Sequence, residues 1–179
     1  MRIGFDLDRV FIDHPPFISD MVIDRLYKKH HEPELTYRIP SRLEQFLRRL
    51  THYPIFRKIL KENLHFLKNL ARRRKDTYYL ISGRFDFLKT ATQKIIEKHH
   101  FDKLFTGMYF NFDNQQPHRF KNNIIKKLKL NKYVDDDLDL LKYLAKHNPR
   151  TIFYWLNPKQ NTKIEKNLFA ITNLKKLNI

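Results

Sequence analysis

Acidic and hydroxyl side chains follow three short β-rich runs of this sequence, and their spacing suits chemistry at phosphorus. They are Asp6 and Asp8, Ser82, and the acids Asp135, Asp136 and Asp137. Two acids at positions i and i+2 after a strand can place one carboxylate as a nucleophile and the other beside a leaving oxygen. Several acids at one sheet edge repel one another unless a cation lies among them, and Mg²⁺ prefers oxygen ligands. The sequence therefore predicts a magnesium-assisted phosphoryl site at the carboxyl ends of the strands.

The elements that must position these side chains follow from the hydrophobic pattern. The β-rich runs are 2–5, 77–81, 104–110, 132–134 and 151–156, and segments with apolar residues at helical spacing lie at 87–98, 120–130 and 138–147. A repeated strand-then-helix order predicts an α/β fold, a Rossmann-like core of about five parallel strands with helices on both faces.

The segment between the first two strands, residues 14–75, is expected to be helical throughout. Ser41 and Glu44 form a capping box, in which each side chain satisfies a free backbone N–H. An apolar stripe follows, made of Leu43, Phe46, Leu47 and Leu50. A second helix is expected after Pro54, and its inward side chains would be Ile55, Ile59, Leu60, Leu64, Leu67 and Leu70. We therefore expect 14–75 to be a small helical insertion into a core made of 1–13 and 76–179.

Four segments, in this order, resemble the four motifs of the haloacid dehalogenase (HAD) superfamily. DLDRVFID at 6–13 is similar to the first motif, D-x-D-G-[VT]-h-h-D, and ISGR at 81–84 is similar to the second, a strand that ends in Ser or Thr. Lys121, fourteen residues before Asp135, is placed like the third-motif lysine, and YVDDD at 133–137 resembles the fourth motif. The resemblance covers the core from end to end. It implies a HAD-like core with a small α-helical cap at 14–75.

The resemblance implies a magnesium-dependent phosphatase that forms an aspartyl phosphate. Asp6 would attack the phosphoryl group, and Asp8 would protonate the leaving oxygen and then deprotonate the hydrolytic water. Ser82 would hold the oxygens of the transferred group, and Lys121 would neutralise their charge and that of Asp6. The resemblance implies that Mg²⁺ is bound by Asp6, by the backbone carbonyl of Asp8 and by an acid of the fourth motif, either Asp136, which aligns best, or Asp135. Asp8 also favours phosphate esters over carbon–halogen bonds, since true dehalogenases lack this second acid.

The residue after Asp8 departs from the family pattern, because the usual glycine is replaced by Arg9. A cationic side chain there can tighten binding of an anionic substrate, point into solvent, or mark a site that has lost catalysis. Gly83 and Arg84 are candidate substrate contacts beside Ser82, although an arginine at this place more often has a structural role.

Two other features near the motifs are assigned mainly structural roles. Asp137 and Asp139 are expected to cap the following helix and complement its dipole rather than bind metal. His14, directly after the first motif, is the one histidine with a candidate role.

The charge of the chain predicts an anionic partner. Lys and Arg number 36 against 19 acids, a formal net charge of +17 in 179 residues, and Cys is absent. The missing Cys excludes disulfide scaffolds and cysteine-ligated metals. The region 14–75 is the more basic part of the chain, so the sequence favours a phosphorylated small-molecule substrate. The alternative is a catalytically weak HAD-like module that binds nucleic acid or another polyanion through its basic cap.

The expected location is the cytoplasm. The sequence has neither a signal-peptide pattern nor an apolar run of membrane-spanning length. A role at a membrane surface is not expected either, on the premise that no cap helix combines a strong apolar face with exposed large aromatic side chains.

Overall fold

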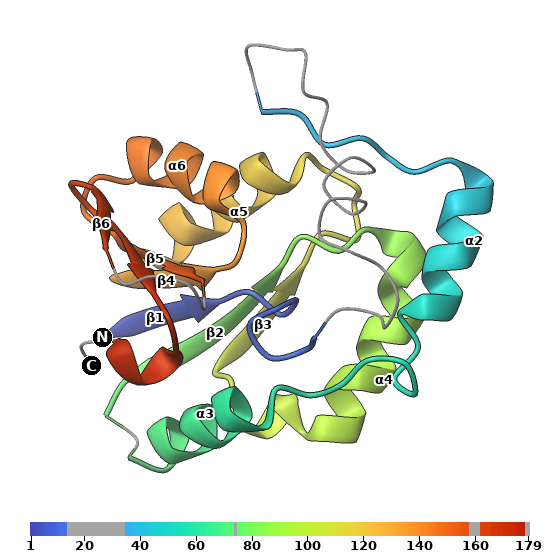
Figure 1. The fold of residues 1–179 in the computed structure, drawn as a ribbon, viewed down its shortest axis with the longest axis horizontal. Helices are drawn as coiled ribbons and strands as arrows, with labels where there is room; N and C mark the ends of the chain where they lie inside the picture. The colour runs from blue at the N-terminus through green and yellow to red at the C-terminus, as the bar shows by residue number, and fades with distance from the viewer. Residues whose placement is uncertain (14–34, 74, 158–161, 178–179) are drawn as a thin grey trace.

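A seven-stranded sheet forms the centre of the computed structural model, which describes residues 1–13, 35–73, 75–157 and 162–177 (Figure 1). The strands are β1 (Arg2–Phe5), β2 (Thr77–Ser82), β3 (Gly107–Phe110), β4 (Lys132–Asp135), β5 (Ile152–Leu156), β6 (Lys163–Glu165) and β7 (Leu168–Ile171). The α-helices are α2 (Arg42–Thr51), α3 (Lys61–Arg73), α4 (Lys89–His99), α5 (Pro117–Leu128) and α6 (Leu138–His147). Three short 3₁₀ helices are η1 (Asp86–Leu88), η2 (Phe101–Lys103) and η3 (Leu174–Lys176).

The sheet is mostly parallel, which confirms the predicted α/β class. Its strand order is β3-β2-β1-β4-β5-β7-β6, and only the edge pair β6–β7 is antiparallel. The predicted number of five strands is too small, because β6 and β7 extend the sheet beyond β5. The strand expected at 104–110 is also shorter, since β3 begins at Gly107.

Helices cover both faces of the sheet, and the alternation of side chains along the strands explains why. In β1, Ile3 and Phe5 point to one face and are buried in one cluster with apolar residues of α3 and α4. On the other face, a Cβ added to Gly4 would meet Leu130 and Tyr133. Tyr133 belongs to a second cluster, formed with α5 and α6. Parallel strands that are buried on both sides in this way are typical of α/β sheets whose crossover helices cover both faces.

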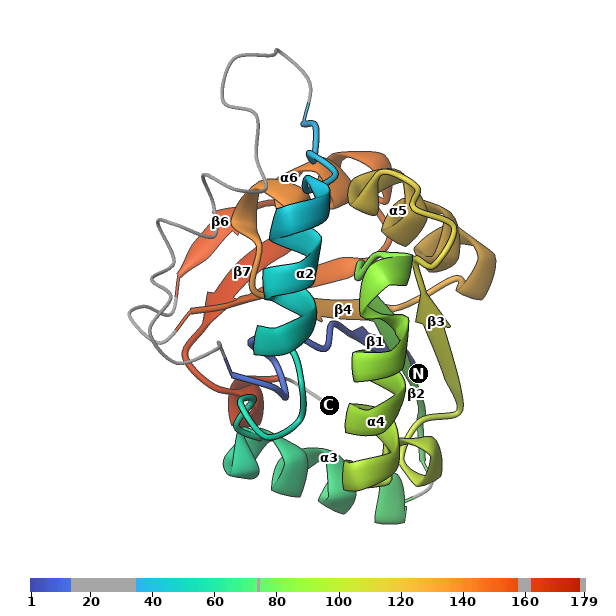
Figure 2. The same cartoon turned by 90° about the vertical axis from the view of Figure 1, so that its right-hand side faces the viewer.

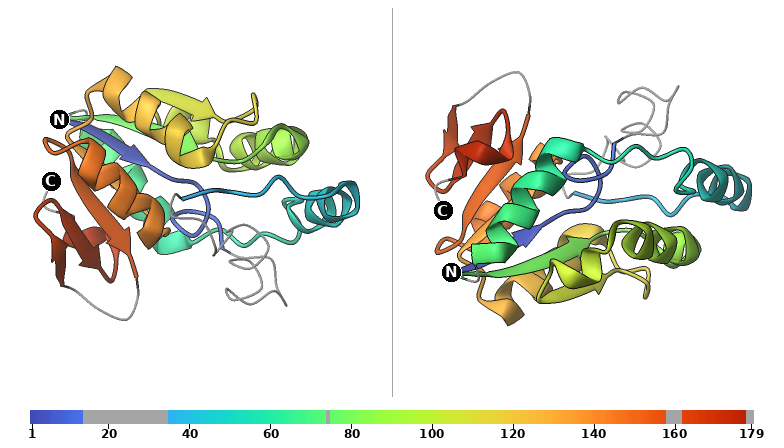
Figure 3. Two further views of the ribbon diagram at one scale, coloured as in Figure 1. Left: turned by 90° about the horizontal axis from the view of Figure 1, so that it is seen from above. Right: turned by 90° about the horizontal axis from the view of Figure 1, so that it is seen from below.

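Helix α3 packs on the sheet, although it lies in the segment expected to form the insertion. Its Leu64, Leu67 and Leu70 share the buried cluster of Ile3 and Phe5. Within the described part of 14–75, α2 stands away from the sheet, whereas Ile59 still packs against that cluster. Figures 2 and 3 show α2 running beside α4 and apart from the strands.

Helix α2 begins with the predicted capping box but presents its apolar stripe to solvent. Ser41 accepts a hydrogen bond from the Glu44 backbone N–H, and the Glu44 carboxylate accepts one from the Ser41 N–H. The prediction that Ile55 turns inward is wrong, since Ile55 is 80% exposed and α3 begins only at Lys61. No helix among the described residues is long and apolar enough to cross a bilayer.

Candidate active site

The candidate site lies where the chain reverses its direction of travel across the sheet. From β1 the chain adds β2 and β3 on one side, and then β4 and β5 on the other. The switch between the neighbouring strands β1 and β4 leaves a crevice at their carboxyl ends, the place where ligands bind in open α/β sheets. Asp6 directly follows β1, and Asp135 is the last residue of β4. The Asp6 N–H donates to the carbonyl of Val134 at 2.9 Å, which fixes the two strand ends side by side.

Lys121 of α5 binds both of these carboxylates. Its Nζ lies 2.7 Å from Asp6 Oδ1 and 2.7 Å from Asp135 Oδ2, and all three side chains are buried. Gly83, after β2, explains how α5 comes this close. A Cβ at Gly83 would lie 3.2 Å from Pro117 Cβ and 3.5 Å from Lys121 Cε, so a larger residue would push the helix away.

The pKa values of this group show that it is short of positive charge. Burial, and next the neighbouring acids Asp135 and Asp8, raise the pKa of Asp6 to about 7 despite the opposing effect of Lys121. Burial alone would lower the pKa of Lys121, but the carboxylates of Asp135 and Asp6 raise it well above its ordinary value. Lys121 is therefore charged throughout the neutral range, and one ammonium does not offset all the acids around it.

Asp135 is held by groups on either side of it. Tyr133 donates its hydroxyl to Asp135 Oδ2 at 2.9 Å, and the Asp137 backbone N–H donates to Asp135 Oδ1 at 3.1 Å. Asp137 is the N-cap of α6, accepting from the backbone N–H groups of Asp139 and Leu140, as predicted. The strand end and the following helix together fix the orientation of the Asp135 carboxylate.

Arg9, which replaces the usual glycine of the resembled motif, lies against Asp136. Its Nη1 is 3.2 Å from Asp136 Oδ2. The backbone of Arg9 has φ 56°, in the left-handed region. Glycine adopts this region without steric cost, whereas the Cβ of an arginine makes it strained. Burial and the nearby Asp135 raise the pKa of Asp136 well above its ordinary value, although Arg9 opposes this. Arg9 thus forms an ion pair with a candidate metal ligand, and the three alternatives for its function stay open.

The three carboxylates Asp6, Asp135 and Asp136 fit a divalent cation. They form the group of possible metal ligands within the described residues, with one oxygen of each lying within 4.8 Å of the others. All the donors are hard oxygens, as Mg²⁺ prefers. With Arg9 turned away, three carboxylates and the Lys121 ammonium would leave two negative charges, which match one Mg²⁺.

Asp8 lies beside this group but is bound by arginines. Arg84 donates from Nε to Oδ2 and from Nη2 to Oδ1, both at 2.7 Å, and Arg57 also donates to Oδ1. Both guanidiniums are almost fully buried, whereas the Asp8 side chain is 29% exposed. Burial opposes ionisation of Asp8, but Arg84 and Arg57 hold its pKa well below the usual range. Asp8 is therefore an ionised carboxylate in this arrangement.

A second layer of polar side chains supports Asp8 from α2. Arg48 and His52 point inward from α2 and are buried. Burial lowers the pKa of Arg48 to about 9, and burial together with Arg57 and Arg84 lowers the pKa of His52 well below its ordinary value. Arg48 also lies over the ring of Phe87, 5.9 Å from its centroid. The polar side of α2 thus faces the Asp8 cluster.

The structure brings most of the predicted site residues together. Asp6 and Asp135 both contact Lys121 directly, and Asp136 joins them through the candidate metal group. Ser82 is buried at the end of β2, where its Oγ accepts from the Arg84 backbone N–H at 3.4 Å. Arg84 has the structural role expected of it, because it binds Asp8 and Thr92. His14 lies outside the described residues.

Two residues of the cluster were not predicted, Arg57 and Tyr133. Arg57 is one of 36 cations and lies 49 residues from Asp8 in sequence, so no local pattern separates it from a surface arginine. Tyr133 stands two residues before Asp135 on β4, which places both side chains on one face of the strand. The two-residue spacing from Asp135 is therefore a sequence signal that could have identified Tyr133.

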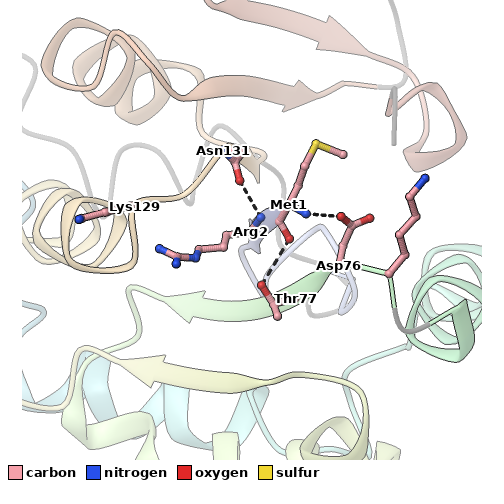
Figure 4. A pocket seen from close by; sticks show the side chains of 7 residues that line it. Met1, Arg2, Asp76, Thr77, Lys129 and Asn131 are labelled. Carbon is pink, nitrogen blue, oxygen red and sulfur yellow. Dashed lines mark hydrogen bonds and ion pairs between the residues drawn. The ribbon is translucent and has the colours of Figure 1, made fainter.

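A pocket lies at the opposite end of the sheet, near the start of β1 and β2 (Figure 4). Its polar groups bind one another there. The Asn131 side chain accepts from the Arg2 N–H at 2.8 Å, the Thr77 hydroxyl donates to the Met1 carbonyl, and the Met1 ammonium pairs with Asp76. The pocket is therefore separate from the acidic cluster.

The fold and the site together define an α/β protein with an acid-and-lysine cluster at its switch point. No protein-family model matches the chain, and no curated protein is found to be similar to it.

Replacing Arg9 by Gly is expected to tighten Mg²⁺ binding. The change removes a cation that competes for Asp136, and a partly exposed ion pair of about 1 kcal/mol corresponds to a gain of roughly fivefold. Isothermal titration calorimetry of the metal-free protein with Mg²⁺ measures the change in Mg²⁺ affinity. Arg9→Ala should show the same gain but keep the backbone strain, so it should unfold at a lower temperature than Arg9→Gly. Unchanged or weaker Mg²⁺ binding in both variants would show that Arg9 does not compete with the metal.

The stability of the metal-free protein is expected to fall as pH rises. The pKa of Asp6 is about 7 in the folded protein and 3.8 ordinarily, so folding favours its protonated form. This stabilisation is complete below the ordinary value and is lost as pH rises through about 7. Relative to Asp6→Asn, wild type should lose about 2 kcal/mol of unfolding free energy between about pH 5 and pH 8. Urea unfolding in EDTA tests this, and parallel curves for the two proteins would contradict it.

Proposed function

We propose that this protein is a magnesium-dependent phosphatase of the HAD type, acting on a phosphorylated small molecule. The observation that carries the proposal is the contact of Lys121 with Asp6 and Asp135 at the switch point of the sheet. A nucleophilic carboxylate needs a fixed cation beside it, and a transferred phosphoryl group needs positive charge at its oxygens. Lys121 supplies both from one position.

In the proposed first step, a carboxylate oxygen of Asp6 attacks phosphorus. The bond from phosphorus to the leaving oxygen breaks as the Asp6–phosphorus bond forms, which gives an aspartyl phosphate. Asp6 is oriented for this by Lys121 at Oδ1 and by the Asp8 backbone N–H, which donates to Oδ2 at 3.0 Å. Ser82 and the neighbouring backbone N–H groups would bind the phosphoryl oxygens. Mg²⁺, held by Asp6, Asp136 and Asp135, would neutralise charge on the phosphoryl oxygens.

In the proposed second step, water attacks the aspartyl phosphate and frees Asp6. Asp8, two residues on, would take the proton from this water as a general base, and its ionised form is the one that accepts a proton. In the first step Asp8 would have to donate a proton to the leaving oxygen, so it would first have to take one up from solvent, which the two arginines oppose. We therefore infer that Arg57 withdraws from Asp8 when substrate binds. Arg57 lies between α2 and α3, so such a movement would belong to the proposed cap.

The alternative function is a HAD-like module that binds a polyanion without turnover. It rests on the net charge of +17 and on Arg9 beside Asp136. Two of the cations in the proposed cap, Arg48 and Arg57, are buried toward Asp8, so they are not part of an outer binding surface. This favours the phosphatase proposal over the alternative.

Hydrolysis of an aryl phosphate distinguishes the two functions. The phosphatase proposal predicts phosphate release that requires Mg²⁺ and stops in EDTA. The alternative predicts no turnover with Mg²⁺, Mn²⁺ or Co²⁺, and binding to a labelled oligonucleotide that weakens steeply between low and high salt. A panel of phosphorylated metabolites, assayed in parallel with the aryl phosphate, would then identify the substrate class.

A further inference from the structure

Helix α2 has the opposite orientation to an ordinary surface helix, because it buries polar side chains and exposes apolar ones. Its Arg48 and the C-cap residue His52 are buried toward the Asp8 cluster, whereas its apolar residues point away from the protein. An amphipathic helix normally buries its apolar stripe and exposes its polar face. The reversed orientation indicates that the outer side of α2 serves as a contact surface.

The exposed apolar side chains continue from α2 into the flanking turns. We call this set the outer α2 face; it consists of Ile39, Leu43, Phe46, Leu47, Leu50, Tyr53, Ile55 and Phe56, which are 40–80% exposed. Among the described residues, the one other large exposed apolar side chain is Met1. Single exposed apolar residues are ordinary, but eight large ones within residues 39–56 mark a candidate interaction site.

Basic side chains border the outer α2 face. Arg42, Arg49 and Lys58 are exposed beside it. From α4, Lys94 reaches Tyr53 at 2.8 Å and Lys98 reaches the Pro54 carbonyl at 3.3 Å. Glu44 is the single acid between residues 35 and 60, and it is bound by Arg38 and by the capping box. The outer α2 face is thus apolar and aromatic at its centre and cationic at its border.

We propose that the outer α2 face docks on the surface of an anionic lipid bilayer, with α2 lying in the plane of the interface. Leucine and phenylalanine on one side of a helix with arginine and lysine at its border are the composition of interfacial helices. A second copy of this chain is disfavoured, because it would bring two cationic borders together. The expectation of no membrane-surface role rests on the premise that no cap helix combines a strong apolar face with exposed large aromatic side chains, and that premise is wrong for α2, which exposes Phe46 beside its leucines.

A bilayer also accounts for the shape of the surface better than a protein partner does. The face follows the convex side of one helix and the turn after it, and both Figure 1 and Figure 3 show α2 at the margin of the molecule. A planar interface can accept a protruding helix without a groove, and the anionic headgroups would pair with the border cations.

Vesicle co-sedimentation tests the proposal directly. The full chain is mixed with vesicles of phosphatidylcholine alone or with added phosphatidylglycerol, at low salt and at high salt. We expect binding to the anionic vesicles that persists in part at high salt, because apolar contact is not screened. The triple variant Leu43→Ser/Phe46→Ser/Leu47→Ser should bind at least about tenfold more weakly under all conditions. These side chains are exposed, so folding should be retained, as circular dichroism can verify.

Charge variants separate docking by this face from general attraction of a basic protein. Arg42→Gln/Arg49→Gln should weaken binding to anionic vesicles more than the matched control Lys126→Gln/Lys127→Gln, which removes the same charge from exposed positions on α5. Absence of vesicle binding, equal binding by the triple variant, or equal effects of the two charge variants would overturn the proposal. Light scattering that shows a dimer lost in the triple variant would also overturn it, since the occupant would then be a second copy.

Discussion

Asp6→Asn is expected to abolish phosphate release, lowering kcat by at least about 10³-fold. An amide at this position is a far weaker nucleophile than a carboxylate, and it cannot form the aspartyl phosphate. The substitution preserves the shape of a buried side chain that Lys121 and the Asp8 N–H hold in place. Steady-state hydrolysis of an aryl phosphate at saturating Mg²⁺ measures the effect.

Asp139→Asn is the matched control for this change. Asp139 is an exposed acid in the first turn of α6, away from the acidic cluster, so its loss should leave kcat within about twofold and change stability by less than about 1 kcal/mol. Equal activity of wild type and Asp6→Asn would remove Asp6 from the role of nucleophile.

Lys121→Met is expected to have the second largest effect, on activity and stability together. Met has a similar length, but it leaves Asp6 and Asp135 facing each other without their shared cation. Breaking a buried ion pair by removing one partner costs about 3–5 kcal/mol, because a buried charge remains uncompensated. Activity should fall by at least about 10²-fold, since charge on the phosphoryl oxygens loses its stabilisation.

The pH dependence of this loss identifies its cause. Without Lys121, the carboxylates can relieve their repulsion by binding protons, so the loss of unfolding free energy should be smaller at about pH 5 than at about pH 8. Urea unfolding at the two pH values measures it. Lys126→Met, on the exposed side of the same helix, should change stability little at either pH. If Lys121→Met lowers the unfolding free energy only slightly, and equally at both pH values, Lys121 does not offset the charges of Asp6 and Asp135.

The parts of the fold that could be predicted are those with strong local patterns. Leu140, Leu141 and Leu144 recur at helical spacing and are buried in α6 at the predicted bounds. The strands β6 and β7 were missed because they are short and because no helical segment separates them from β5, so the strand-and-helix alternation gave no signal for them. The place of β7 in the sheet depends on its pairing with β5, a long-range contact, and β6 pairs with β7.

The orientation of α2 could not be predicted from its periodicity. The stripe from Leu43 to Leu50 is as regular as that of a buried helix, and a pattern alone does not state which side meets the protein. The inward side of α2 is the polar one because Arg48 and His52 face the Asp8 cluster, a contact between residues far apart in sequence.

The candidate site was predictable where it depends on strand ends. Asp6, Ser82 and Asp135 stand at one edge of the sheet because the carboxyl ends of neighbouring parallel strands lie there, and Asp6 and Asp135 meet at Lys121. Arg57 was not predictable, since its contact with Asp8 depends on the path of the chain between α2 and α3. The ion pair of Arg9 with Asp136 likewise depends on a positive φ that sequence pattern does not predict for an arginine.

Chemical trapping of the proposed intermediate tests the central claim most directly. The protein would be mixed with Mg²⁺ and an aryl phosphate, quenched with acid during turnover, and treated with borohydride, which reduces an aspartyl phosphate to homoserine. Mass spectrometry of the peptide that contains Asp6 and Asp8 then locates the modified residue. The proposal predicts homoserine at position 6, dependent on substrate and Mg²⁺. Turnover without modification at position 6, or modification at another residue, would contradict it.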